Sequence, residues 1–423
     1  MTLQDRLLKI SRFLFFTLIF LLPLNLGKHF EIIDSYVWGI LIDYLIPTIY
    51  LQDILVFLIL VLWVLGYGFK RFIVNVSSIL DRREVQLSIL FIFSVLLSVL
   101  TAFRIIPSIY SYVRLFIYFL LFVYILSEIP IEDHFFKILH LFSISVLFLS
   151  ILGVAQYLNK GSVFNNYLIL GEQPYSASTF DVAKKPFMGR YVIPAYGLFR
   201  HPNIFGGYLS IFLVWFLTFI KRHKSFPLIF ILGCISLFFT FSLISWVVFI
   251  AGILLHYFFL KKPENIKVRK KIAVFAVFLL CLLVTLLPLT WFFNNSNDPS
   301  IFRRVHFSRA SARMIRDYPL FGVGWNNSTI LMDEYNYETR DIRFVQPVHN
   351  IFLLVFSESG VFSFILFSYF LYFSAKKLIN SSYFHLFLIS FLQILLLGSF
   401  DHYFLTINQT LLLFWVILGL ALQ

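Results

Sequence analysis

Long apolar runs, many of them close to twenty residues, alternate with polar segments along almost the whole chain. A helix needs about twenty apolar residues to cross about 30 Å of hydrocarbon, whereas strands of a membrane barrel alternate in polarity over about ten residues. The pattern therefore predicts an all-α polytopic membrane protein with about twelve transmembrane helices, and no internal repeat or soluble domain interrupts this single integral membrane domain, residues 1–423. The expected helices span 12–26, 51–69, 87–103, 109–126, 135–157, 204–220, 226–240, 242–260, 272–292, 350–374, 382–398 and 403–422.

Charged residues between the runs predict an orientation. Lysine and arginine gather in short connections that share one side if the N-terminus is cytoplasmic, as the positive-inside rule requires. These connections hold Lys70-Arg71, Arg82-Arg83, Lys221-Arg222 with Lys224, the 261–271 cluster and Lys376-Lys377. Three longer segments, 27–50, 158–203 and 293–349, then face outward.

Composition agrees with this membrane assignment. With 60% hydrophobic and 13% charged residues, the chain is not a water-soluble globule. The first apolar run resembles a signal peptide but continues to Leu26 without a small-residue cleavage site, so we expect a retained helix. Cys234 and Cys281 lie inside apolar runs, which favours packing roles over a disulfide or a metal site.

The outer segment 293–349 is rich in arginine and contains no lysine. Its arginines are Arg303, Arg304, Arg309, Arg313, Arg316, Arg340 and Arg343. Planar guanidinium groups bind phosphate or carboxylate through two parallel hydrogen bonds, so this composition indicates anion binding rather than positive charge alone. Arg340 and Arg343 are the weaker candidates because acidic residues lie beside them in sequence.

Residues 302–317 are predicted to form an amphipathic helix within this segment. His306, Arg309, Arg313 and Arg316 share one face, and Phe307, Ala310 and Met314 share another, as the helical period requires. Two interpretations remain open. The helix lies on the outer leaflet with its arginines toward lipid headgroups, or its basic face closes over a cavity and holds a pyrophosphate.

Histidine and further arginines stand at the points where the outer segments re-enter the membrane. His349 is a candidate general base at an interface, although a histidine there is also a common interfacial residue, and Asn350 is expected to orient it or to bind a sugar hydroxyl. Arg200 and His201 bring a cation and a proton donor to the start of the 204–220 helix, and Asn203 is a plausible cap. Arg114 lies within an apolar run, so it faces the bundle interior as a functional residue or as the partner of Asp53 or Asp401.

Several common motifs are absent. The chain has no phosphate-binding glycine loop, no Gly-x-Ser-x-Gly, no His-Glu-x-x-His and no Asp-x-Asp. We therefore expect a metal-independent site built from arginine and histidine, with no cofactor and no nucleic acid partner.

Three stretches in order resemble the bacterial O-antigen ligase and O-antigen polymerase superfamily. They are 195–209 (AYGLFRHPNIFGGYL), 314–324 (MIRDYPLFGVG) and 349–360, which contains His349-Asn350-Ile351-Phe352-Leu353 and Glu358-Ser359-Gly360. Asp401-His402-Tyr403 also resembles the ending of that family. On this resemblance, residues 195–374 form the O-antigen ligase-like core, within a frame of about twelve spans covering almost the whole chain.

The resemblance implies a glycosyltransferase of the GT-C type in the bacterial cytoplasmic (inner) membrane, with its active site on the outer face. Its donor would be an undecaprenyl-pyrophosphate-linked glycan and its acceptor a glycan or a lipid-linked molecule, for the assembly of surface polysaccharide such as lipopolysaccharide. His349 would be the base, and Arg303, Arg304, Arg309 and Arg200 would bind the donor pyrophosphate in the large outer catalytic loop 293–349. Asn350, Arg313, His201 and Arg114 would support them. One departure is that Thr240-Phe241-Ser242 is followed by Leu243 where the family often has an arginine, a contact that Arg200 is expected to replace.

The leading hypothesis is therefore transfer of a lipid-pyrophosphate-linked oligosaccharide to an acceptor hydroxyl, with inversion at the anomeric carbon as in the family. Polymerase, ligase and protein-glycosylating activities all remain open. The alternative is a transporter or flippase, which would be expected to show symmetry between halves and broken helices at mid-membrane. A purely structural membrane protein would leave the outer arginines unexplained.

Overall fold

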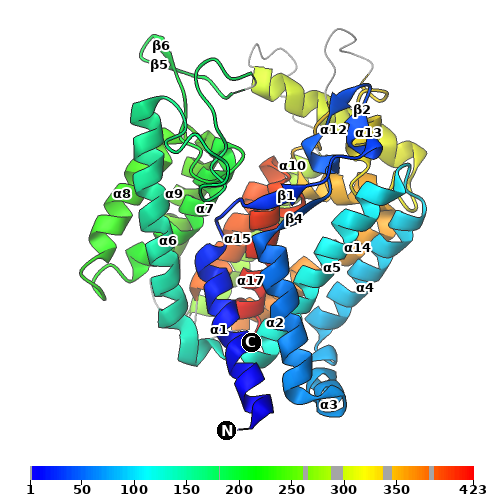
Figure 1. The fold of residues 1–423 in the computed structure, drawn as a ribbon, viewed down its shortest axis with the longest axis vertical. Helices are drawn as coiled ribbons and strands as arrows, with labels where there is room; N and C mark the ends of the chain where they lie inside the picture. The colour runs from blue at the N-terminus through cyan, green and yellow to red at the C-terminus, as the bar shows by residue number, and fades with distance from the viewer. Residues whose placement is uncertain (1, 181, 261–264, 287–298, 337–344, 381–384) are drawn as a thin grey trace.

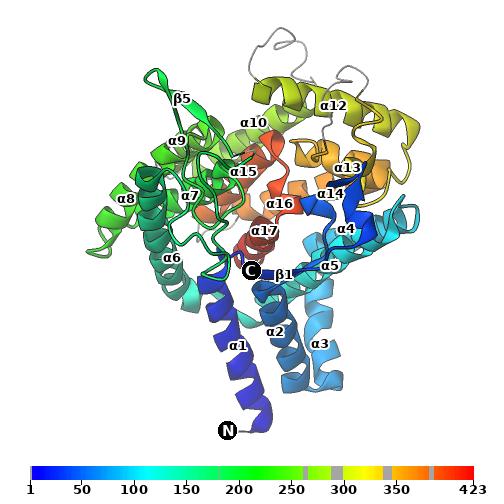
Figure 2. The ribbon, with the colours of Figure 1, turned by 45° about the horizontal axis from the view of Figure 1, so that its top comes forward.

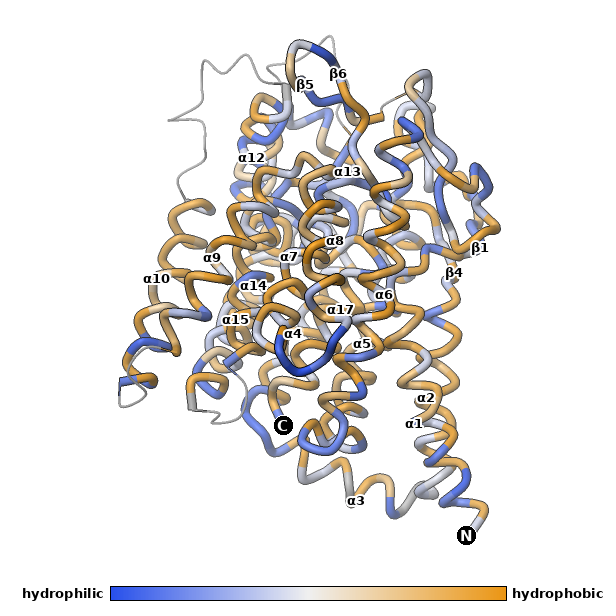
Figure 3. Tube along the Cα trace, turned by 90° about the vertical axis from the view of Figure 1, so that its left-hand side faces the viewer, coloured by the Kyte–Doolittle hydropathy of each residue, from blue (hydrophilic) through white to orange (hydrophobic). Residues whose placement is uncertain are grey.

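The protein is mainly helical, with a few short β-hairpins (Figure 1). The computed structural model describes residues 2–180, 182–260, 265–286, 299–336, 345–380 and 385–423. Apolar residues occupy the middle of the molecule, and hydrophilic segments gather toward its two ends (Figure 3). This distribution is the one that a membrane environment favours.

Each apolar segment expected to be helical contains helix, although several of these helices end short of the expected bounds, as the first does at Leu21 instead of Leu26. The helices in question are α1 (Leu3–Leu21), α2 (Leu51–Tyr67), α4 (Arg83–Leu100), α5 (Ile105–Glu128), α6 (Ile131–Asn159), α7 (Pro202–Thr218), α8 (Phe226–Phe239), α9 (Leu243–Leu260), α10 (Ile266–Leu286), α14 (Ile351–Asn380), α15 (His385–Phe400), α16 (Tyr403–Thr406) and α17 (Asn408–Ala421). The first helix begins well before the predicted residue 12, because Thr2 and Asp5 cap each other's backbone. The last expected segment is two helices, which are separated at Ile407.

Length and composition qualify fewer helices as membrane crossings than the sequence predicts. Among the described residues, α4, α5, α6, α9 and α14 are long and apolar enough, and α2 with α3 (Phe69–Leu80) would add a sixth if that pair, bent by 105°, is one span. Helices α7, α8, α15 and α17 are apolar but shorter. The structure thus describes a multi-pass membrane protein, whereas about twelve crossings stay a prediction.

Helices α15 and α17 lie near the centre of the molecule (Figure 1), and α7 packs against α15. Nearly all of their side chains are buried, including Trp215, Phe391 and Trp415. Because other helices surround them, they can be apolar on every face without contacting lipid. The candidate active site lies at the end of α15.

The outer segments fold as small hairpins and a surface helix at the end opposite the N-terminus (Figures 1 and 2). In 27–50, β1 (Gly27–His29) pairs with β4 (Thr48–Tyr50) and β2 (Tyr36–Val37) with β3 (Ile40–Leu41), with the short 3-10 helices Ile33–Ser35 and Asp43–Leu45 between them. In 158–203, β5 (Lys185–Phe187) pairs with β6 (Arg190–Val192). In 293–349, α12 (Pro299–Asp317) is followed by the single turn α13 (Ser328–Leu331).

Helix α12 confirms the amphipathic helix predicted at 302–317. Phe307, Ala310 and Met314 are fully buried, so the predicted apolar face packs onto the protein. The helix crosses the end of the bundle (Figure 2) and packs against α14. Helix α12, which carries five of the arginines of the 293–349 segment, is therefore packed on the protein.

Helix α14 is broken at Gly360, which has a φ of +75°. At this break, the sequence stretch 314–324 forms backbone hydrogen bonds with α14. Val323 N and Gly324 N donate to Ser357 O and Glu358 O, and Val361 N donates to Pro319 O, at 2.9–3.0 Å. The Glu358 carboxylate then accepts from Asn326 N, Ser328 N and the Ser328 hydroxyl at the start of α13. We call residues 319–328 with 357–361 the clasp.

Candidate active site

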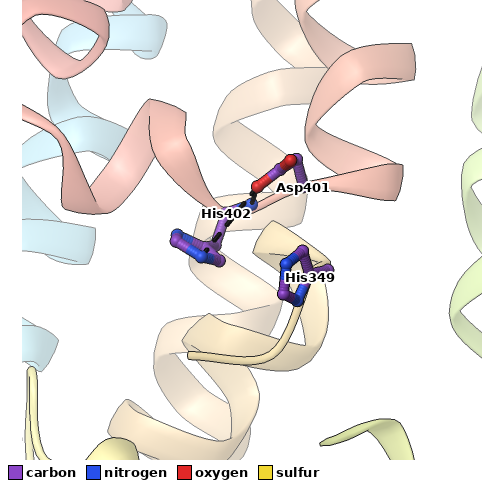
Figure 4. A group of neighbouring side chains, drawn as sticks. All are labelled: His349, Asp401 and His402. Carbon is purple, nitrogen blue, oxygen red and sulfur yellow. Dashed lines mark hydrogen bonds and ion pairs between the residues drawn. The ribbon is translucent and has the colours of Figure 1, made fainter. Parts of the chain in front are cut away.

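His349, Asp401 and His402 come together at the outer-loop end of the central helices (Figure 4). His349 lies two residues before the start of α14, and Asp401-His402 joins α15 to α16. One polar side-chain atom from each lies within 4.8 Å of those of the other two. Asp401 and His402 are buried and His349 is partly exposed, so the cluster is open on the His349 side.

Local hydrogen bonds hold Asp401 and His402 in place. The Asp401 carboxylate accepts from His402 N at 2.8 Å, and His402 Nδ1 lies 2.7 Å from the Thr406 hydroxyl. The His349 ring stands nearly edge-on to the His402 ring, with centroids 5.1 Å apart. His349 Nδ1, in contrast, is buried and has no hydrogen-bond partner among the described residues. Such a nitrogen is unusual in a packed structure and is a candidate for function.

Helix α12 covers the cluster. Phe307 stacks on His349 with an angle of 2° between the rings and 5.6 Å between their centroids. Arg304, one turn earlier, is close enough for its charge to act on His349, Asp401 and His402. Its Nε is buried without a hydrogen-bond partner among the described residues. The arginine-rich helix and the predicted base thus belong to one site.

Burial and neighbouring charges set the protonation of the cluster. Burial lowers the pKa of His349 well below its usual value; the Asp401 carboxylate opposes this shift, and His402, Arg304 and His201 add to it. The pKa of His402 is lowered by burial and by Arg304 against the opposing effect of Asp401. Burial raises the pKa of Asp401, but the charges of the two histidines, Arg304 and His201 lower it more. At neutral pH the site therefore holds a carboxylate between neutral imidazoles.

His201 lies next to this cluster, on the 158–203 segment. Burial, together with Lys185, Arg304 and Arg303, lowers its pKa to about 4 against the opposing effect of Asp401. The side chain is nevertheless exposed to solvent, as a residue in a concave surface can be, and water reduces such shifts. His201 Nδ1 accepts a hydrogen bond from Asn203 N, so His201 caps α7 and the expected cap at Asn203 is wrong.

Asn350 has a structural role that the sequence did not reveal. Its Oδ1 accepts from Phe352 N and Leu353 N and thereby caps α14. Its Nδ2 donates to the Thr285 hydroxyl on α10 and to Ser399 O on α15. With its polar atoms engaged in this way, Asn350 fixes the backbone beside His349 rather than offering a free group to a sugar.

Arg309, Arg313 and Arg316 lie progressively farther along α12 from Arg304. Arg309 is partly buried, and Arg313 Nη1 donates to Tyr335 O at 2.8 Å. Arg316 is exposed and paired with Asp317. Arg340 and Arg343 lie outside the described residues.

Arg114 and Arg200 line a different space, a polar cavity beside the cluster. Arg114 pairs with Asp53 at 3.0 Å, so the predicted partner Asp53 is confirmed and Asp401 is not needed for that role. Arg200 Nη2 donates to the Tyr50 hydroxyl at 3.0 Å. The charge of Arg200 also acts on His29 and Tyr167.

Asp401 and His402 are the site residues that sequence reasoning missed. Their signal in the sequence was an adjacent pair of titratable residues directly after an apolar run. Their ligand atoms and those of His349 lie close enough to share a divalent cation. The charge of Arg304 opposes a cation at that position.

The fold and the site define a multi-pass helical membrane protein whose buried carboxylate and two histidines lie under an arginine-bearing surface helix. Residues 228–368 match the family model described as O-Antigen ligase, and this match supports membership of the chain in the O-antigen ligase and polymerase superfamily. The matched region runs from α8 into α14 and includes α12 and His349. A search of curated proteins and a search of solved structures each found no match.

Proposed function

We propose that the protein is a glycosyltransferase that moves an oligosaccharide from an undecaprenyl-pyrophosphate carrier to the hydroxyl of an acceptor on the outer side of the bacterial cytoplasmic membrane. The observation that carries this proposal is the neutral His349 imidazole, whose Nδ1 has no partner among the described residues and on which the charges of the Asp401 carboxylate and Arg304 act. The family match adds a lipid-linked glycan as the class of substrate.

The chemistry requires one base and a place for negative charge. The acceptor oxygen attacks the anomeric carbon as its proton passes to the His349 imidazole, and the bond from that carbon to the pyrophosphate oxygen breaks. The lipid pyrophosphate leaves with the bonding electrons, next to Arg303 and Arg304. Asp401 stabilises the imidazolium that forms at His349.

Donor binding would itself strengthen this base. His349 has a low pKa in the free protein because burial and positive neighbours disfavour its charged form. A pyrophosphate bound at Arg304 offsets that positive charge and raises the pKa of His349. The imidazole would then accept a proton more readily once the donor is in place.

A transporter is less well supported by the described residues. The break in α14 is a feature that carriers also show. In this protein the backbone groups freed by the break bind residues 319–324. They are therefore engaged by the protein itself rather than offered to a substrate.

The decisive experiment incubates the purified protein in detergent with a lipid-pyrophosphate-linked oligosaccharide and an acceptor, and measures released lipid pyrophosphate and elongated or ligated product. We expect wild type to release lipid pyrophosphate and His349→Gln to lose about 10²- to 10⁴-fold in rate, the usual contribution of a general base. His223→Gln, at an exposed histidine in the connection between α7 and α8, is the matched control. Wild-type activity in His349→Gln, with its folding verified by an unchanged melting temperature, would contradict the assignment, and movement of intact donor across vesicles would favour a carrier.

The donor site is tested on α12 with two arginines of the same helix. Arg304→Gln is expected to raise the KM for the donor by about 10- to 100-fold, because a hydrogen bond to a charged group contributes about 1.5–3 kcal/mol. Arg316→Gln, which removes an exposed guanidinium paired with Asp317, should leave that KM unchanged. Equal effects of the two substitutions would show that α12 attracts the donor only through its overall charge.

A further inference from the structure

The polar cavity beside the cluster is built mainly from the hairpin of residues 27–50, from α5 and from the α16–α17 junction. It is lined by Asp43, Tyr44, Ile46, Thr48, Tyr50, Tyr110, Ser111, Arg114, Arg200, Asn326, Thr406, Ile407 and Asn408. Its free space for the centres of water molecules is about 30 Å³, enough for about two waters. It therefore admits the oxygens of an anionic group but excludes a sugar ring.

Arg200 in this cavity has few partners for a guanidinium. Its Nε is buried with no hydrogen-bond partner among the described residues, and Nη2 has the Tyr50 hydroxyl. Nη1 lies 3.5 Å from the Asp43 carboxylate, whose side chain is 64% exposed. A solvated carboxylate at this distance compensates a buried cation only weakly.

Arg114, in contrast, is largely neutralised. It binds Asp53 at 3.0 Å and lies over the rings of Tyr50 and Tyr110, at 4.9 and 4.6 Å from their centroids. These contacts compensate the charge of Arg114, although its Nε, like that of Arg200, is buried with no hydrogen-bond partner among the described residues. The excess positive charge at this position therefore belongs to Arg200.

Two residues that line the cavity also contact His402 of the catalytic cluster. Tyr44 lines the cavity and stands edge-on to His402 at 5.3 Å between ring centroids. Thr406 lines the cavity and contacts His402 Nδ1 at 2.7 Å. Arg304 acts on the cluster from α12, so Arg200 and Arg304 approach it from different structural elements.

We propose that this cavity is a second anion subsite, in which Arg200 binds a phosphate group carried by the acceptor while Arg303 and Arg304 bind the donor pyrophosphate. The inference rests on the proposed function and refines it. The sequence predicts Arg200 among the donor ligands, and the cavity assigns it to the other substrate. The acceptor is then a phosphate-bearing molecule, either a second lipid-pyrophosphate-linked glycan or a phosphorylated glycolipid.

Equilibrium binding of labelled inorganic pyrophosphate to the purified protein tests the subsite without requiring turnover. Wild type and His349→Gln should bind two molecules per chain, and Arg200→Gln and Arg304→Gln one each. A stoichiometry that Arg200→Gln leaves unchanged would overturn the second subsite, and the donor site and the catalytic assignment would stand. Loss of binding in Arg304→Gln alone, with a single site in wild type, would likewise overturn it.

Asp43→Asn provides an independent variant that is not expected to disturb folding, because that side chain is mostly exposed. Removal of the competing carboxylate should tighten pyrophosphate binding at the Arg200 subsite several-fold, and unchanged affinity there would contradict the proposal. In transfer assays, Arg200→Gln should raise the KM for the acceptor and leave the KM for the donor unchanged.

The source of the phosphate follows from comparing acceptors. If Arg200→Gln raises the KM for a lipid-pyrophosphate-linked acceptor, that class is the acceptor. If it raises the KM for a phosphorylated glycolipid, the glycolipid is. An equal effect on the dephosphorylated glycolipid would show that Arg200 does not recognise phosphate.

Discussion

His349 depends on its neighbours for its protonation. Burial keeps the imidazole neutral, and Asp401 supplies the negative charge that opposes this effect. The same carboxylate has its own pKa lowered by the surrounding positive groups, although burial alone would raise it. Asp401 is thus ionised over the pH range in which His349 can act as a base.

The pH dependence of transfer should reveal this coupling. A base is active when deprotonated, so activity falls as the pH drops through the pKa of His349, which lies well below its usual value in the free protein. Asp401→Asn removes the charge that raises this pKa, so the acid limb of kcat/KM should move to lower pH while the maximal rate falls.

Asp317→Asn, at an exposed carboxylate bonded to Arg316 and Tyr335, should leave the acid limb in place. An acid limb that stays fixed or moves to higher pH in Asp401→Asn would show that Asp401 does not act electrostatically on His349.

Sequence reasoning predicted part of this site. His349 and Arg304 could be proposed because both belong to one arginine-rich segment that ends at a helix start. Asp401 and His402 could not, because their approach to His349 depends on how α14 and α15 pack, and spacing along the chain does not encode that packing. Asn350 looked polar and available, whereas helix capping engages it.

At the scale of secondary-structure elements, the clasp explains two of the glycine motifs. Gly360 and Gly322 both have positive φ, at +75° and +70°. A Cβ at Gly360 would lie 2.1 Å from Leu320 O, and one at Gly322 would lie 2.3 Å from the Glu358 carbonyl carbon. Glycine is required at both positions because backbone meets backbone there.

Gly360→Ala is therefore expected to destabilise the protein by about 2–5 kcal/mol, from positive φ and from overpacking together. Gly189→Ala is the matched control, since Gly189 has a similar φ of +76° but open space around its Cα. That control should cost only about 1–2 kcal/mol. Thermal unfolding in detergent measures both, and equal losses would mean that the clasp adds no constraint beyond φ.

The hydrophobic pattern predicted the helices well and their lengths less well. Apolar periodicity located a helix in each expected segment, because burial and lipid both select apolar side chains. It did not reveal the break at Gly360 or the buried positions of α7, α15 and α17. A helix buried in protein and a helix exposed to lipid have similar compositions, so the pattern could not separate them.

At the scale of the whole molecule, the three outer segments and α12 share one end (Figures 1 and 2), and the His349–Asp401–His402 cluster lies against α12. The N-terminus and α3 lie at the other end. On the orientation that the charged connections predict, the end that bears the cluster faces outward.

Cysteine labelling tests that orientation. In a Cys234→Ala, Cys281→Ala background, Ser178→Cys in the exposed 158–203 segment should react with a membrane-impermeant maleimide in spheroplasts. Lys224→Cys, exposed in the connection between α7 and α8, should react only after lysis. The reverse pattern would place the catalytic cluster in the cytoplasm.

The clasp also anchors the outer segment to α14 at a second point, apart from the one beside His349. Val323 and Gly324 bind α14 at the clasp, and the chain enters the same helix beside His349; these two attachment points are about ten residues apart, or about 15 Å along a helix. Because both ends of the intervening segment are held on α14, we expect an insertion within it to leave His349 in place. The length of this segment can then change while the position of the histidine stays constant.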